Sequence, residues 1–438
     1  MTRHVVREGN DLARALAALG VALAGLIGTV ARADPGAPSV TSEPAVEATG
    51  AERVSLGVTY FGDALATVSG GVAPGWAYEG RLGLLLDANL DGVVAWQGAH
   101  LHASLNQIHG QEPTPSHVGA LSQISGIEAE PNTRLFNLWV EGNLGPHTTL
   151  RAGQFTADQE FAISSNAALF VNSTFGWPNI FAQDLPSGGP AYPIGGLGVR
   201  LIRTTSRGAF LIAVFNGDPA GPGGGDPQQR DRSGLNSFRL SGGPFAIAEA
   251  QFHLPLAGAQ VRLGSWWLGR KVPAQALDQG LGVGSISQTR DGDWGAYGSA
   301  DFYLVKRGDT VISGFLRVAA APGDRNLVST YADAGLTVPG SSWGRSKDQL
   351  GLAVSWSGVG RAARALDARS VASGDLAFER DHELVVELTY QAQMTPQWWI
   401  QPDIQWVVHP GGRIPLASDP TRRIPDAVIV GVRNTLKF

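Results

Sequence analysis

The first group of residues that could bind a ligand is the segment DANLDG at residues 87–92, which matches the first half of a calcium-binding loop. A complete EF-hand loop also needs a bidentate glutamate at its twelfth position, where this sequence has Gly98, and it needs helices on both flanks. Here the flanks alternate in the manner of strands. We therefore interpret the segment as a turn between two strands, where Asp, Asn and Gly are favoured.

His100 and His102 form a second candidate, because residues two apart on a strand share one face and could bind a metal together. No third ligand lies nearby in the sequence, and a polar strand face accounts for both histidines. The chain has no cysteine and no G-x-S-x-G motif, so a nucleophile would have to be a serine paired with a distant histidine. A barrel enzyme of that kind remains an open alternative, but we expect neither catalysis, nor a metal, nor a cofactor.

These polar residues lie in segments whose hydrophobicity alternates with period two, the spacing that predicts strands. In residues 398–408, for example, Ile404 and Trp406 alternate with Asp403 and Gln405. About 15 such segments can be recognised: 54–61, 76–87, 93–105, 134–142, 148–156, 196–204, 208–215, 245–254, 258–268, 292–304, 309–319, 348–357, 382–392, 398–408 and 426–438.

The apolar strand faces could form the core of a soluble sandwich or contact lipid around a membrane barrel. The strands are about 10 residues long, which suits a tilted membrane crossing. Short connections (142–147 and 394–397) contrast with long ones (157–195 and 409–425), as in barrels with short periplasmic turns and long outer loops. We predict an all-β, transmembrane antiparallel barrel of about 16 strands over residues 51–438, because the strand number is even in such barrels.

Both ends of the chain favour the bacterial outer membrane. Arg3, Arg7 and Arg14 precede a short apolar run at 15–30 and an A-x-A site, which predicts a signal peptide at 1–33. Residues 34–50 read as a flexible periplasmic linker. The last strand ends on Phe438, so we expect outer-membrane lipid and the barrel-assembly machinery as partners, and a periplasmic C-terminus.

Charge excludes one class of partner. Residues 1–33 hold four arginines and two acids, so the remaining chain has a net charge of about −7, which disfavours nucleic acid.

The long connection at 157–196 is too aromatic to lie in solvent, so we expect it to fold into the barrel and constrict the lumen. Its larger aromatic residues are Phe161, Phe170, Phe175, Trp177, Phe181 and Tyr192. The inward strand faces are predicted to carry both signs of charge, from Arg81, Arg151, Arg200, Glu141 and Glu249. Charged groups bond sugar hydroxyls while a ring such as Trp177 packs on the sugar's C–H face, so this lumen suits neutral polyols.

The sequence resembles the carbohydrate-selective porins of the OprB family, from about Val54 to Phe438. The most specific segments are SGIEAEPNTRLFNLWVEGNL (125–144), RAGQFTADQEFAISSNAALFVNSTFGWP (151–178), GGPAYPIGGLGVR (188–200), VFNGDP (214–219) and ELTYQAQMTPQWWIQPDIQWVVHPGG (387–412). The resemblance implies a barrel that passes monosaccharides such as glucose by diffusion through a charged and aromatic eyelet. It places Asp158, Glu160, Asn172, Trp177 and Arg200 near that eyelet.

The sequence thus predicts a passive, substrate-selective sugar channel in the outer membrane. The alternative is a general or ion-preferring porin without a sugar site. The expected substrate-binding residues are Asp158, Glu160, Asn172, Trp177, Arg200, Arg81, Arg151 and Glu141.

Overall fold

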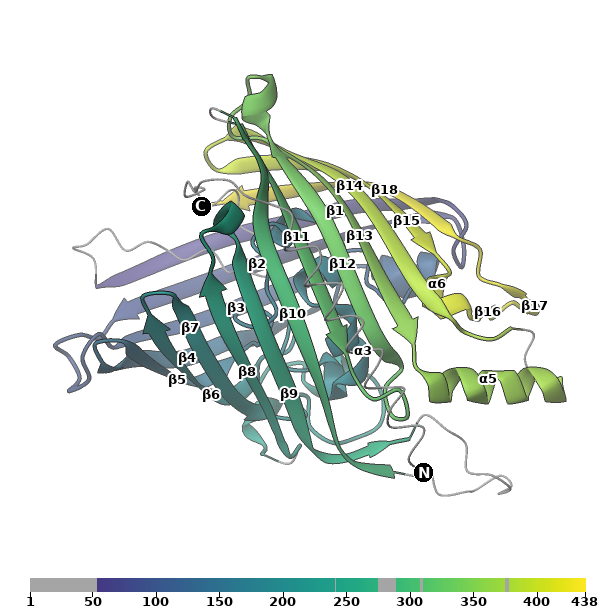
Figure 1. Ribbon diagram of the computed structural model, residues 1–438, viewed down its shortest axis with the longest axis horizontal. Coiled ribbons are helices and arrows are strands. Elements are labelled where there is room, and N and C mark those ends of the chain that lie inside the picture. The colour runs from purple at the N-terminus through teal and green to yellow at the C-terminus, as the bar shows by residue number, and fades with distance from the viewer. Residues whose placement is uncertain (1–52, 241, 275–288, 308–309, 375–377) are drawn as a thin grey trace.

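The computed structural model describes residues 53–438 apart from 241, 275–288, 308–309 and 375–377 (Figure 1). The predicted signal peptide (1–33) and linker (34–50) lie outside the described residues.

Within this part of the chain, sixteen antiparallel strands close into one barrel, as predicted. The strands are β1 (Val54–Ser69), β2 (Gly75–Asn89), β3 (His100–Gly110), β4 (Asn132–Gly145), β5 (Thr148–Phe155), β6 (Gly196–Thr205), β7 (Gly208–Asn216), β8 (Pro244–His253), β9 (Gln260–Pro273), β10 (Thr289–Arg307), β11 (Thr310–Ala320), β12 (Val328–Pro339), β13 (Gln349–Val359), β14 (His382–Thr395), β15 (Trp398–Val408) and β18 (Ala427–Lys437).

Closure comes from pairing of the first strand with the last. Thr59 lies opposite Lys437 in the β1–β18 ladder, and the amide of Phe438 donates to the carbonyl of Val58 at 2.9 Å. Each barrel strand therefore has two neighbours, which removes the unpaired sheet edges that lipid cannot satisfy.

The alternation along each strand separates an outer apolar face from an inner polar face. On β15, Ile404 and Trp406 are 46% and 48% exposed, whereas Asp403 and Gln405 are 6% and 0% exposed. The apolar residues point away from the barrel and the polar ones into it, which is the arrangement of a membrane barrel rather than a soluble sandwich.

Connections at the two ends of the barrel differ in length. At the short-turn end, the turns 146–147, 206–207 and 396–397 have two residues each. At the long-loop end lie the connections 111–131, 156–195, 217–243 and 409–426. Figure 1 shows α5 (Arg361–Ser373) and the hairpin of β16 (Pro415–Leu416) and β17 (Asp419–Arg423) projecting from this end.

The remaining helices are short. They are η1 (Thr114–Val118), η2 (Ala167–Leu169), α2 (Ser173–Gly176), α3 (Asn179–Asp184), η3 (Pro186–Gly188), α4 (Pro227–Arg230), η4 (Asn236–Phe238), η5 (Leu256–Gly258), η6 (Gly340–Trp343) and α6 (Pro410–Arg413). Among the described residues, every helix is too short or too polar to cross a membrane.

Two details of the strand prediction were wrong. The missing sixteenth strand is β12, whose outward face includes Ala332 and Ala334 and therefore carries only a weak apolar signal. Residues 93–99, assigned to the third strand, instead form part of the turn before it. There the side chain of Asn89 accepts from the amide of Asp91 and that of Asp91 accepts from the amide of Gly98, at 2.8 and 3.0 Å.

Two long connections, 111–131 and 156–195, fold into the lumen, and buried charges on the barrel wall bind their backbones. Glu383 accepts from the amides of Leu121 and Ser122 at 2.6 and 2.8 Å. Glu387 accepts in the same way from Val171 and Asn172 at 2.6 and 2.9 Å. These carboxylates supply hydrogen-bond partners for backbone groups that have left water.

Arg317 on β11 provides the complementary positive anchor. Its guanidinium donates to the carbonyls of Ala162, Thr174 and Phe175 at 3.1, 3.1 and 2.8 Å. It also pairs with Asp333 on β12, and both side chains are almost fully buried. The segment 156–195 is therefore bonded to two separate strands of the wall, β11 and β14.

Replacing Arg317 with methionine should release this segment from β11. Removing one partner of a buried ion pair costs about 3–5 kcal/mol, so we expect faster proteolysis within 156–195 and a higher single-channel conductance. The control is Arg345→Met, which removes an arginine paired with Asp348 at the short-turn end. Unchanged proteolysis and conductance in a folded Arg317→Met barrel would show that the arginine does not anchor the segment.

Candidate functional site

Four of the predicted residues meet in one charged quartet: Glu141, Arg151, Glu160 and Arg200. Arg151 bonds Glu141 at 2.9 Å and Glu160 at 2.5 Å, and Arg200 bonds the same two carboxylates at 2.7 and 2.5 Å. Each arginine thus contacts both acids. The quartet has no net charge, and these charge-assisted hydrogen bonds fix its four side chains.

Strand register creates three corners of the quartet. Glu141 on β4 lies directly opposite Arg151 on β5, and Arg151 lies opposite Arg200 on β6. Two arginines facing each other across strands would repel. Glu160, which comes from the in-folded segment, offsets this repulsion by bonding both of them.

Aromatic rings support the quartet from the next level of the wall. The guanidinium carbon of Arg151 lies 3.6 Å from the ring centroid of Trp139, a cation–π contact. His102 stacks on the same ring with 4.9 Å between centroids, and its Nδ1 lies 2.7 Å from the carboxylate of Asp87. Gly153, opposite Trp139 in the ladder, leaves space there, since a Cβ would lie 2.6 Å from the tryptophan Cα.

A cavity of about 640 Å³ opens beside these groups, towards the short-turn end of strands β2 to β8. It is lined by Asp87, His100, His102, Trp139, Arg151, Gln159, Glu160, Arg200, Ile202, Thr204, Ala209, Leu211 and Gln251. The lining combines the charged groups and the indole with amide, hydroxyl and aliphatic side chains. It can therefore exchange hydrogen bonds with a polar solute and also cover apolar parts of it.

Asn172 and Trp177 lie elsewhere, where they shape the in-folded segment. The Asn172 side chain accepts from the amide of Thr174 at 3.1 Å and donates to Gln405 on the wall at 2.9 Å. Trp177 stacks on Phe181 with 4.3 Å between centroids. Both residues are buried, and their contacts hold the segment together rather than line the cavity.

Arg81 and Asp158 meet at Tyr192, where the two in-folded connections touch. Asp158 accepts from the amide of Tyr192 at 3.0 Å, and the Arg81 guanidinium lies 5.1 Å from the tyrosine ring centroid. The Tyr192 hydroxyl donates to the carbonyl of Ile127 at 2.8 Å. Burial raises the pKa of this phenol, so Tyr192 stays a neutral donor.

Trp139, His102 and Asp87 also belong to the site, and none of them was predicted from the sequence as a binding residue for the solute. Trp139 could have been found, because it is two residues from Glu141 and so shares its inward face. His102 and Asp87 were considered only as metal ligands. Their proximity to the tryptophan follows from the β2–β3–β4 register.

One carboxyl in the connection 111–131 has a strongly altered acidity. Burial raises the pKa of Glu128 to about 8, although hydrogen bonds from the amide and hydroxyl of Thr114, at 3.0 and 2.6 Å, act in the opposite direction. The nearby carboxylate of Glu112 raises it further. Glu128 is fully buried, so it is mainly neutral below this pH.

Comparisons with known proteins agree with this architecture. A family model described as carbohydrate-selective porin, OprB family, matches residues 73–438. The high-pH structure of Pseudomonas putida OprB is similar, with a TM-score of 0.76 and 17% identity over 88% of this chain and 94% of that one. Its low-pH structure has a TM-score of 0.51, with 14% identity over 88% and 92% of the two chains.

The outer-membrane channel DcaP of Acinetobacter baumannii also has a TM-score of 0.51, with 11% identity over 88% of this chain and 97% of that one. A search of curated protein sequences finds no match. Because the sequence identities are 17% or lower, the similarity to these solved structures supports the fold alone.

Glu128 makes the packing of 111–131 depend on pH. An exposed glutamate has already lost its proton above pH 4.5, whereas the buried one retains it up to about 8. The contribution of Glu128 to folding stability is therefore fully present below a pH of about 4.5, and it is lost as the pH rises to about 8. We expect hydrogen exchange of amides 114–128, corrected for intrinsic rates, to speed up over this range. Glu128→Gln, which mimics the neutral form, should remove this trend; a persistent trend would assign it to another group.

Proposed function

The chain belongs to the OprB family of carbohydrate-selective porins, and on this premise we propose that it recognises its sugar at the charged quartet and the adjoining cavity. Family and fold together make it a sugar-selective channel of the bacterial outer membrane, not an enzyme. The observation that carries the proposal is a charge-balanced quartet beside an indole in a cavity of about 640 Å³. Ligand sites commonly have volumes of roughly 300–1,000 Å³.

Charge balance favours a neutral substrate. Rings of one sign select ions of the opposite sign, as acidic rings do for cations. Here Glu141 and Glu160 are matched by Arg151 and Arg200. A neutral sugar can bond with its hydroxyls to carboxylates as acceptors and to guanidiniums as donors, and it needs no counter-ion.

The remaining lining suits the apolar face of a pyranose ring. Trp139 offers an indole, while Ile202 and Leu211 offer aliphatic surface within the same cavity. Packing of the sugar's C–H groups on the aromatic ring adds to the hydroxyl contacts. It therefore favours binding of a sugar over binding of a polar solute that has no such apolar face. We therefore propose monosaccharides such as glucose as the substrate class.

Asn172, Trp177, Asp158 and Arg81 have an indirect role in this proposal. Their hydrogen bonds and stacking hold the segment 156–195 in the lumen, and this segment carries Glu160 to the arginines. They are positioning residues for the quartet.

We also propose that lipid covers the outer face and that the barrel-assembly machinery recognises the last strand. The apolar outward residues of β15 support the first idea, and the exposed aromatic ring of Phe438, beyond the end of β18, supports the second.

Glu160→Gln tests the quartet directly. The change leaves two arginines against one acid, and a charge-assisted hydrogen bond contributes about 1.5–3 kcal/mol. We expect glucose entry into proteoliposomes to fall roughly ten-fold at low concentration, and the channel to shift towards anions. Arg345→Gln, at the short-turn end, is the control. Equal entry of glucose and amino acids of similar size in the unaltered protein would instead favour the general or ion-preferring porin.

A pair of tryptophan variants separates direct contact from positioning. Trp139→Leu should reduce discrimination between glucose and amino acids without releasing segment 156–195. Trp177→Leu should act through that segment, so its proteolysis should speed up together with any loss of selectivity. Swelling rates and limited proteolysis measured side by side decide this, and normal selectivity in Trp139→Leu would remove the indole from the site.

A further inference from the structure

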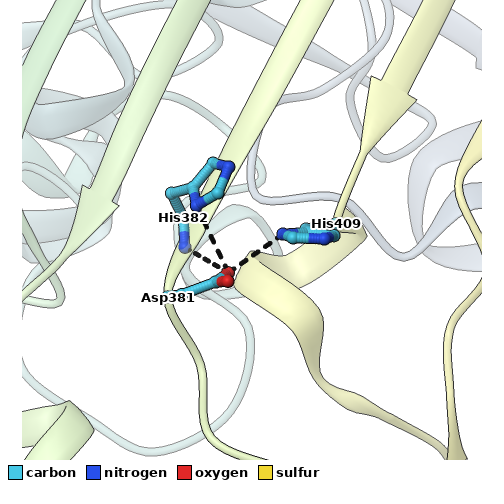
Figure 2. A group of neighbouring side chains, drawn as sticks. All are labelled: Asp381, His382 and His409. Carbon is cyan, nitrogen blue, oxygen red and sulfur yellow. Dashed lines mark hydrogen bonds and ion pairs between the residues drawn. The ribbon is translucent and has the colours of Figure 1, made fainter.

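Asp381, His382 and His409 form a separate cluster at the long-loop end of the barrel (Figure 2). Asp381 immediately precedes β14, and His409 immediately follows β15. These strands are antiparallel neighbours in which Leu384 lies opposite Val408. Their pairing therefore brings together residues that are far apart in sequence, and all three side chains are partly exposed.

The distances from each imidazole to the carboxylate are those expected between ligands of one metal ion, and all three ligand atoms lie within 4.8 Å of one another. Nδ1 of His409 lies 3.1 Å from Oδ1 of Asp381, and Nδ1 of His382 lies 3.5 Å from the same oxygen. Two tetrahedral ligands about 2.0–2.1 Å from zinc are separated by roughly 3.3 Å. Figure 2 shows both imidazoles directed towards the carboxylate.

The backbone around His409 is held in an unusual conformation that sets the direction of its ring. His409 has a φ of 54° and Arg413 a φ of 84°, both in the left-handed region that non-glycine residues seldom adopt. The amide of His409 donates to Asp426 at 3.0 Å, and that of Gly411 donates to Glu383 at 2.8 Å. Such strain persists only where surrounding contacts enforce it, and it often marks a functional position.

We propose that Asp381, His382 and His409 bind a divalent transition-metal ion, with Zn²⁺ as the reference ion. Nδ1 of His409, a ring nitrogen of His382 and Oδ1 of Asp381 supply three ligands, which leaves a fourth position for water. Imidazole favours zinc, copper and nickel, whereas calcium and magnesium need more oxygen ligands than this cluster offers. Such a site departs from the sequence-based expectation of no metal.

Two arginines modulate the site. Nη1 of Arg413 lies 3.4 Å from Oδ2 of Asp381, so it can orient the carboxylate while Oδ1 binds the ion. Nη1 of Arg423 lies 3.5 Å from Nε2 of His409. A guanidinium only donates, so Nε2 accepts and the ring proton sits on Nδ1. When an ion binds Nδ1, the neutral ring carries its proton on Nε2 instead, where it faces the Arg423 guanidinium, which is also a donor. Arg423 must then move away, so it weakens binding.

Titration of ZnCl₂ into the untagged, chelator-treated porin in detergent tests the proposal. We expect one site that His409→Ala and Asp381→Asn each weaken at least about ten-fold, in the range seen when a metal site loses a supporting group. Arg423→Gln should tighten binding several-fold because it removes the competing cation. His253→Ala, an exposed histidine at the short-turn end, is the matched control and should bind as the unaltered protein does.

Co²⁺ provides a second measurement, because a four-coordinate site with nitrogen ligands gives an intense visible absorption that His409→Ala should abolish. Heat-modifiable migration on gels shows that each variant has folded. Absence of zinc binding, or equal binding by His409→Ala and the unaltered barrel, would overturn the proposal. The glucose entry rate serves as an independent readout, since the quartet lies towards the other end of the barrel.

Discussion

Backbone groups that enter the lumen of a membrane barrel leave bulk water and must find hydrogen-bond partners there. This constraint explains why the inner wall carries so many buried charges. Glu387 binds two successive amides of the segment 156–195, and Arg317 binds its carbonyls from another strand. Without these anchors the segment would have no fixed path, and Glu160 would have no fixed position.

The quartet depends on the same anchoring of the segment 156–195, because that segment supplies Glu160. Register alone places Arg151 and Arg200 opposite each other, an arrangement that repels unless acids intervene. Glu141 lies on the barrel wall, whereas Glu160 lies on the anchored segment. The wall and the segment therefore stabilise each other: the arginines bind the segment's carboxylate, and that carboxylate allows the arginines to lie side by side.

Much of the fold could be predicted because period-two alternation is a local property. The inward faces of Glu141, Arg151 and Arg200 followed from it, as did the long connection and the terminal strand. Strand β12 was missed because small outward residues such as Ala332 weaken the signal. Trp177 was predicted as a binding residue because it lies in an aromatic segment, yet it is Trp139 on the wall that lines the cavity. Only the folded path of the segment decides which of the two rings does so.

The cluster at the long-loop end shows the limit of sequence reasoning most clearly. His100 and His102 share a strand face and were considered as a metal-binding pair. In the structure both rings pack against Trp139, and His102 also contacts the carboxylate of Asp87. His382 begins β14 and His409 follows the end of β15, so no regular spacing in the sequence indicates that they meet. Antiparallel pairing joins the start of one strand to the end of the next, so ligand sets at barrel rims arise from register and must be sought there.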